Sequence, residues 1–109
     1  MAPSEFLALA DEALAAIEDA VARVADSSDI DIEADRSGNV LEIAFADRSK
    51  IIVNLQEPMS EIWLAARGGA FHFRWNGVAW VDTREGRELF DTLSKFASQH
   101  AGTALLLKA

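Results

Sequence analysis

Apolar residues near the start of the chain recur every three or four positions, a spacing that predicts an amphipathic helix. Ser4, which follows Pro3, is the expected N-cap of this helix. Such a stripe would bury one side of the helix and leave the other in water. Its members are Phe6, Leu9, Ala10, Ala13, Leu14, Ile17, Val21 and Val24.

A second stripe of this kind predicts a helix that begins at about Thr83 or Arg84 and ends near Ala101. Gly102 is its expected stop, because glycine readily adopts the left-handed conformation that follows many helices. Residues 103–109 are too apolar to be left in water, so we expect them to pack against the helices. The stripe consists of Leu89, Phe90, Leu93, Phe96 and Ala97.

Between the two stripes the apolar and polar residues alternate, which indicates strands. Expected strands cover residues 29–35, 40–46, 50–55, a segment around 62–64, 70–75 and 78–81, and Asn76-Gly77 predicts a two-residue type I′ turn. The short connections favour an antiparallel meander. The sequence therefore predicts one domain over residues 1–109. It is an α+β two-layer sandwich, with a six-stranded antiparallel sheet and both helices on one face.

The alternation also predicts what the other, open face of the sheet carries. If Ile51 and its alternating neighbours face the core, then Asn54 and Gln56 point outward, and Trp63 does so from the next strand. Tryptophan is enriched among the anchors of protein interfaces, so this set favours a docking surface. The alternative interpretation is that Trp63 covers a second core. His72 is also expected on this face, where it could add one contact to a metal or a partner.

Charge adds a second surface. Eighteen acidic residues against ten basic ones give a net charge of -8, which disfavours nucleic acid and attracts cations or basic protein surfaces. Acidic residues occupy the outer side of the first helix and the outer positions of the first strand. We call this set the acidic ridge: Asp11, Glu12, Glu18, Asp19, Asp26, Asp29, Asp31 and Glu33.

Carboxylates on exposed regular structure suit hard metal ions, which would keep much of their water, so binding is expected to be weak and poorly selective. The alternative interpretation is a solvated acidic face that confers solubility.

Some functions are disfavoured. The chain has no cysteine, no apolar run close to the roughly 20 residues of a membrane span and no secretion signal, which favours a cytoplasmic location. It also lacks the common catalytic motifs, and His100 is expected to be structural or merely exposed at a helix end.

Three short motifs carry a family resemblance. The motif Asn54-x-Gln56-x-Pro58 is followed by Ile62-Trp63-Leu64, and it occurs with Ser28-Asp29-Ile30-Asp31 and Gly69-x-Phe71-His72-Phe73. In these motifs the sequence resembles the frataxin family, in particular its bacterial branch, over nearly the whole chain.

The resemblance implies a protein that binds iron, as Fe²⁺ or Fe³⁺, on the acidic ridge. It also implies docking on a cysteine desulfurase and an iron–sulfur scaffold protein through Glu18, Asp19 and the open face, to supply iron or regulate cluster assembly. It implies a monomer that can assemble when loaded with iron, and no enzyme beyond weak surface oxidation of ferrous iron. Ala22, Arg23 and Ala25 stand where relatives are often acidic, which thins the ridge, and Leu7 replaces a histidine. The alternative is an acidic adaptor that docks on proteins without metal.

Overall fold

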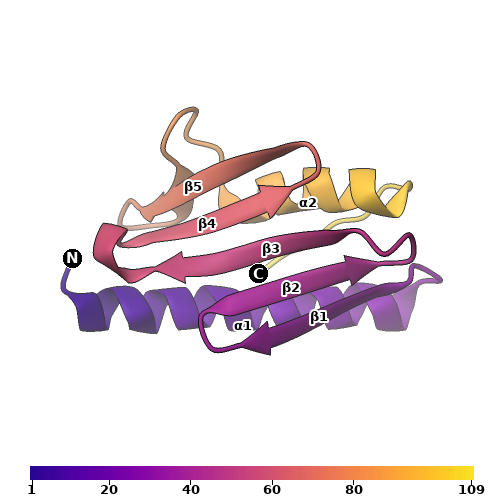
Figure 1. Ribbon diagram of the computed structural model, residues 1–109, viewed down its shortest axis with the longest axis horizontal. Coiled ribbons are helices and arrows are strands. Elements are labelled where there is room, and N and C mark those ends of the chain that lie inside the picture. The colour runs from indigo at the N-terminus through magenta and orange to yellow at the C-terminus, as the bar shows by residue number, and fades with distance from the viewer.

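The computed structural model describes residues 1–109 and has two layers, a six-stranded antiparallel sheet and two helices behind one of its faces (Figure 1). The predicted α+β sandwich is confirmed. The strands lie in the sheet in chain order, so neighbours in sequence are neighbours in space. The elements are α1 (Pro3–Ser27), β1 (Ile32–Ser37), β2 (Val40–Phe45), β3 (Lys50–Gln56), the 3₁₀ turn η1 (Glu57–Met59), β4 (Glu61–Ala66), β5 (Gly69–Trp75), β6 (Trp80–Asp82) and α2 (Leu89–Ala101).

The core lies between the sheet and the helices, as the two apolar stripes and the strand alternation predict. Alternate residues of the central strands point to the helices and are buried, and their burial removes a continuous apolar surface from water. Neither helix has the length and apolarity needed to cross a membrane. The side chains buried most fully include Phe6, Leu14, Ile17, Leu41, Ile43, Ile51, Ile62, Leu64, Phe73, Leu89, Leu93 and Leu107.

The C-terminal segment runs back across the helix layer and is hydrogen-bonded to both helices. The Ser94 hydroxyl of α2 donates to the carbonyl oxygen of Leu107 at 3.1 Å and accepts from its amide at 2.9 Å. Ser98 bonds Leu105 in the same way, and the Leu107 side chain is only 1 % exposed. The expected packing of the tail is confirmed.

Both predicted helix starts are wrong. α1 begins at Pro3 with Ala2 as its N-cap, because proline has no N–H to satisfy and its fixed φ suits the first helical position. α2 begins only at Leu89. The preceding residues form a loop around the carboxylate of Asp82, which accepts hydrogen bonds from three backbone amides. A side chain that satisfies backbone donors in this way competes with helix formation. The predicted stop at Gly102 is confirmed by its φ of 71°.

The strands depart most from the prediction at two places. β1 begins at Ile32, so the acidic residues 29 and 31 precede the strand. The predicted type I′ turn at Asn76-Gly77 is wrong, because a four-residue loop joins Trp75 to Trp80. The Asn76 side chain accepts hydrogen bonds from the amides of Val78 and Ala79 at 2.9 and 2.8 Å, which stabilises the longer loop.

His100 joins three segments at one end of the sheet. Its Nε2 accepts the Arg67 amide at 3.1 Å, so the ring proton lies on Nδ1 and is donated to the Ser49 hydroxyl at 2.7 Å. The ring also stacks on Phe45 with centroids 5.0 Å apart. Burial first, and then the Arg67 charge, lower the pKa of His100 below its usual 6.5. His100 is therefore structural and neutral, and it is not merely exposed at the helix end.

We predict that His100 makes folding sensitive to mild acid. Its folded-state pKa lies below 6.5, so the unfolded chain takes up the proton first and stability falls as pH decreases below 6.5. Urea unfolding at pH 7.5 and 5.5 should show a loss of up to about 1.4 kcal/mol per pH unit.

The variant His100→Gln should be less stable than the wild type at pH 7.5. Its free energy of unfolding should fall less than that of the wild type between pH 7.5 and 5.5. A wild-type slope in His100→Gln would contradict the assignment.

Candidate functional site: the open face and the acidic ridge

Polar and aromatic side chains of three neighbouring strands form one continuous patch on the open face of the sheet. The register pairs Asn54 with Trp63, and Trp63 with His72, so all three share a face. No second layer covers them, and the core interpretation of Trp63 is therefore wrong. We call this set the open-face cluster: Asn54 and Gln56 from β3, Glu61 and Trp63 from β4, and His72 and Arg74 from β5.

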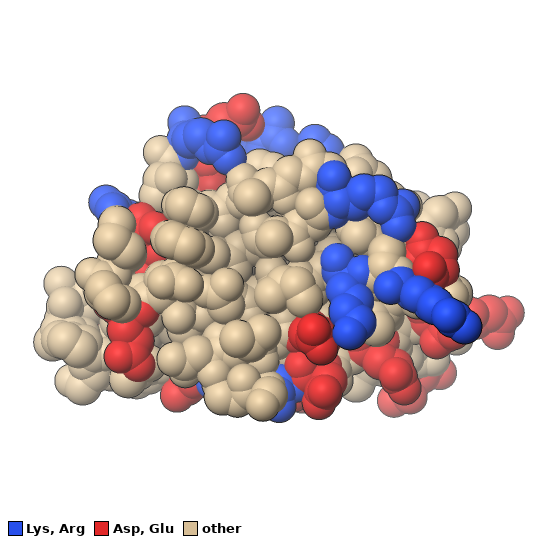
Figure 2. Space-filling view, in the orientation of Figure 1, with Lys and Arg blue, Asp and Glu red and all other residues tan.

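Direct contacts order the open-face cluster. The indole of Trp63 stacks on the imidazole of His72 with centroids 4.2 Å apart and planes 6° from parallel. The Gln56 amide donates to Asn54 Oδ1 at 2.7 Å. Both amides and the indole are half-buried, so each still exposes part of its surface. The centre of this face carries no charged side chain in the view of Figure 2.

Sequence reasoning missed two members of this cluster, Glu61 and Arg74. Glu61 accepts a hydrogen bond from Trp63 Nε1 at 2.9 Å and from Arg74 Nε at 2.7 Å, and its side chain is only 4 % exposed. Burial raises the pKa of Glu61, but these hydrogen bonds and the arginine charge outweigh it and the net shift is downward. Strand alternation counted back from Trp63 already places Glu61 on the same face and could have found it.

The acidic ridge is only partly assembled. Glu18 and Asp26 of α1 and Glu33 of β1 line one shallow hollow of about 560 Å³ between these elements. Asp35, which was not predicted as a site residue, lines it too, because it alternates with Glu33 on β1. Acidic side chains also gather along the lower margin in Figure 2, near β1 and the end of α1.

The remaining ridge residues lie elsewhere. Asp29 and Asp31 line a separate hollow of about 470 Å³ together with Asp47 of the β2–β3 turn. Asp11 forms an ion pair with Arg36, which neutralises it. Glu12 borders an apolar hollow beside Trp75 and Trp80, on another side of α1. Asp19 is exposed and lines none of these hollows.

Chemically, the ridge offers dispersed oxygen ligands. No group of three or more His, Asp or Glu side chains is close enough to hold a metal ion as it stands. The ridge carboxylates are exposed except for the half-buried Glu18, so a cation bound there would be held by few protein ligands and would keep most of its water. Ala22 and Ala25 line the same hollow as Glu18 and Glu33, so two of the three positions that thin the ridge belong to this hollow.

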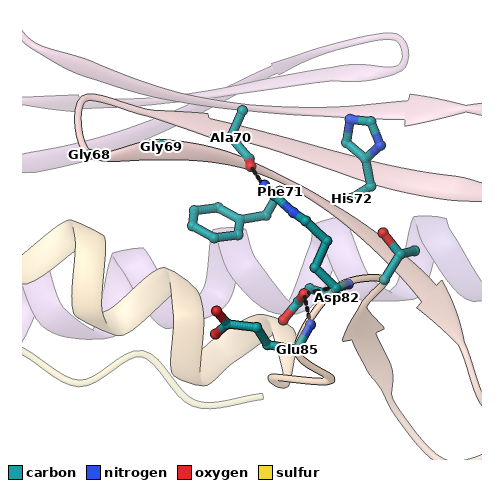
Figure 3. Close-up of a pocket in the computed structure, with 9 residues that line it drawn as sticks. Gly68, Gly69, Ala70, Phe71, His72, Asp82 and Glu85 are labelled. Carbon is teal, nitrogen blue, oxygen red and sulfur yellow. Dashed lines mark hydrogen bonds between the residues drawn. The ribbon is translucent and has the colours of Figure 1, made fainter.

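The largest hollow, about 710 Å³, lies between the first half of β5 and residues 82–85 (Figure 3). Arg84 and Asp82, two of its charged side chains, are hydrogen-bonded within the fold. The Arg84 guanidinium donates to the carbonyl oxygen of Ala70 at 2.6 Å, and the Asp82 carboxylate accepts the amides of residues 84, 85 and 87. Burial raises the pKa of Asp82, but these amides lower it further than burial raises it. His72 also borders this hollow, while its ring stacks on Trp63 in the open-face cluster.

A family model described as a frataxin-like domain matches residues 1–103. The iron–sulfur cluster assembly protein CyaY of Cupriavidus metallidurans is 55% identical over 108 residues, which cover 99% of this chain and 97% of that one. The protein of the same name from Paraburkholderia phytofirmans is 55% identical over 109 residues and the whole of both chains. A solved frataxin structure from Psychromonas ingrahamii matches all of both chains with a TM-score of 0.87 and 29% identity.

The fold is thus that of a frataxin, an α+β sandwich with one open sheet face. The chain belongs to the frataxin-like family, and its similar relatives from Cupriavidus and Paraburkholderia carry the name CyaY. The family resemblance seen in the sequence is confirmed.

We predict that Trp63→Ala leaves the fold intact. Trp63 contributes to the open face and not to the core, so its loss should cost about 1 to 2 kcal/mol, from one aromatic contact and one hydrogen bond. Far-UV circular dichroism should be unchanged, and urea unfolding should give the stability. The control Trp80→Ala removes a buried ring whose centroid lies 5.9 Å from that of Phe6. This substitution should lower the free energy of unfolding by about 3 kcal/mol or more. A loss of folded structure in Trp63→Ala would contradict the assignment.

Proposed function

We propose that this protein takes part in iron–sulfur cluster assembly. In this proposal it is a single domain that binds iron loosely on the acidic ridge, docks on a cysteine desulfurase and its scaffold protein, and supplies iron or regulates the synthesis. The similar CyaY proteins are named for iron–sulfur cluster assembly, which supports the pathway. The observation that carries the iron part is the hollow that carboxylate residues of both α1 and β1 line.

The chemistry of the ridge supports loosely held iron. Carboxylate oxygens are hard ligands that suit Fe²⁺ and Fe³⁺, and the absence of cysteine excludes thiolate ligation of a cluster by this chain alone. Exposed, hydrated ligands favour rapid release, which suits a cargo that is passed on. Glu18, Glu33 and their neighbours would bind this cargo. In this proposal no residue is catalytic, and any oxidation of ferrous iron on this surface would be weak.

The two surfaces have different parts in docking. The ridge and the net charge of -8 would attract a basic partner surface over long range, and this steering weakens as salt rises. The open-face cluster would give short-range contacts through Trp63 and the amides of Asn54 and Gln56. Tryptophans that bury on binding often supply a large part of the binding energy. Iron-dependent assembly of an otherwise monomeric protein is compatible with this arrangement.

One observation favours a second candidate function. The ridge carboxylates do not converge on any three-ligand site, as they would in a preformed metal centre. The second candidate is therefore an acidic adaptor that docks on its partner without metal.

We predict that ferrous iron, titrated under anaerobic conditions and followed by amide NMR, shifts or broadens signals around the hollow between α1 and β1. The double variant Glu18→Gln with Glu33→Gln removes two carboxylates that line this hollow and should weaken this effect about tenfold or more, because fewer charges attract the cation.

A matched control, Glu5→Gln with Glu85→Gln, changes the net charge equally at exposed sites outside this hollow and should keep the wild-type response. Equal responses in both double variants would show non-specific attraction. The absence of any localised response at near-stoichiometric iron would favour the metal-free adaptor.

We predict that Trp63→Ala weakens binding to the desulfurase–scaffold complex at least about tenfold, by loss of an interface anchor. Calorimetry at 50 and 300 mM NaCl should separate the two surfaces. The higher salt concentration should lower the affinity of the wild type and that of Trp63→Ala by a similar factor, because the substitution leaves the charges of the ridge unchanged. Wild-type affinity in folded Trp63→Ala would remove the open face from the proposal.

A further inference from the structure

Glu61 is a buried carboxylate on a face that is otherwise open to water. Its side chain is 4 % exposed, and it points outward from β4 among the open-face cluster. Enclosing a charged group costs free energy unless hydrogen bonds and an opposite charge compensate for it. Here Glu61 Oε1 accepts a hydrogen bond from the Trp63 indole N–H, and Oε2 accepts one from Arg74 Nε. His72 Nδ1 lies 3.6 Å from Oε1. The docking function as proposed makes no use of this group.

The first consequence of Glu61 concerns Trp63. An indole has a single hydrogen-bond donor, and that donor is bound to Glu61 at 2.9 Å. The stack on His72 restrains the ring plane at the same time. With both restraints, the ring is fixed before a partner arrives. Binding by an already ordered aromatic side chain loses less conformational entropy than binding by a mobile one.

The second consequence concerns Arg74. Only its Nε is bound in the structure, to Glu61 at 2.7 Å, and the side chain is 60 % exposed. The remaining guanidinium donors therefore face solvent in an orientation set by Glu61. Such donors match a carboxylate, which guanidinium can bind with two parallel hydrogen bonds.

We propose that Glu61 is a positioning residue for docking, which holds Trp63 and Arg74 in the orientation that the partner recognises. The partner surface that fits them carries an apolar pocket for the indole beside an acidic side chain for Arg74. This inference rests on the proposed function of the open face. It differs from the role of the ridge, which attracts basic surface.

The orientation of Trp63 can be tested without any partner. The indole N–H signal of Trp63, one of three in a ¹⁵N spectrum and assigned with Trp63→Phe, should move and exchange faster with water in Glu61→Ala. Glu61→Gln keeps an acceptor oxygen and should largely preserve the signal. The control Glu42→Ala removes a carboxylate of the same face that pairs with Lys50 and should leave it unchanged. An unaltered Trp63 signal in Glu61→Ala would overturn the inference, and Glu61→Gln serves as the folded comparison if Glu61→Ala is unstable.

Docking is tested by a double-mutant cycle on the desulfurase–scaffold complex. In the wild-type background, Glu61→Ala should weaken binding about tenfold. In a variant that already carries Trp63→Ala and Arg74→Gln, the same substitution should weaken binding less than about twofold, because its effect acts through those two residues. Equal losses in both backgrounds would overturn the positioning role. Arg74→Glu should weaken binding more than Arg74→Gln, because the introduced glutamate would repel the acidic side chain of the partner. Equal effects of the two substitutions would show that the partner has no acidic side chain at this position.

The outcomes separate this inference from the proposed function. If Trp63→Ala binds as the wild type does, the open face does not dock, and both the proposed docking function and the role of Glu61 in it fail. If Trp63→Ala weakens binding but Glu61→Ala does not, the docking function stands and the positioning role alone is wrong.

Discussion

Burial of only one face of the sheet is the constraint on which the rest of this structure depends. Side chains alternate along each strand, so every residue that packs on the helices leaves its neighbours on the opposite side. The core takes the inward set, including Ile51, Val53 and Leu64, and needs nothing from the outward set. The outward positions are therefore available for recognition, and substitutions there leave the packing of the core unchanged.

The polar groups that this fold does bury are all hydrogen-bonded, and no buried side-chain nitrogen or oxygen lacks a partner. Three of them fix features that apolar packing could not. Asp82 organises the loop before α2, His100 joins two turns to the end of α2, and Glu61 orders the open face. Each is stable in its buried state because several donors or acceptors converge on it.

The sequence predicted the layers, the strand order and the core because these follow from periodicity, which is set locally and repeated many times. It failed where one side chain competes with the backbone, as Asp82 does at the start of α2 and Asn76 in the β5–β6 loop. The open-face residues Asn54, Gln56 and Trp63 were placed correctly by alternation. Convergence of the ridge could not be predicted, because it depends on the rotation of α1 against β1 and on pairs such as Asp11 with Arg36.

The C-terminal segment also links the two helices to each other. Leu107 is hydrogen-bonded to Ser94 of α2, and the carbonyl oxygen of Lys108 accepts a hydrogen bond from the Arg23 guanidinium of α1. Leu107 is also nearly completely buried, so the segment cannot detach without exposing apolar surface. Local opening of residues 103–109 would therefore remove one support from each helix at the same time.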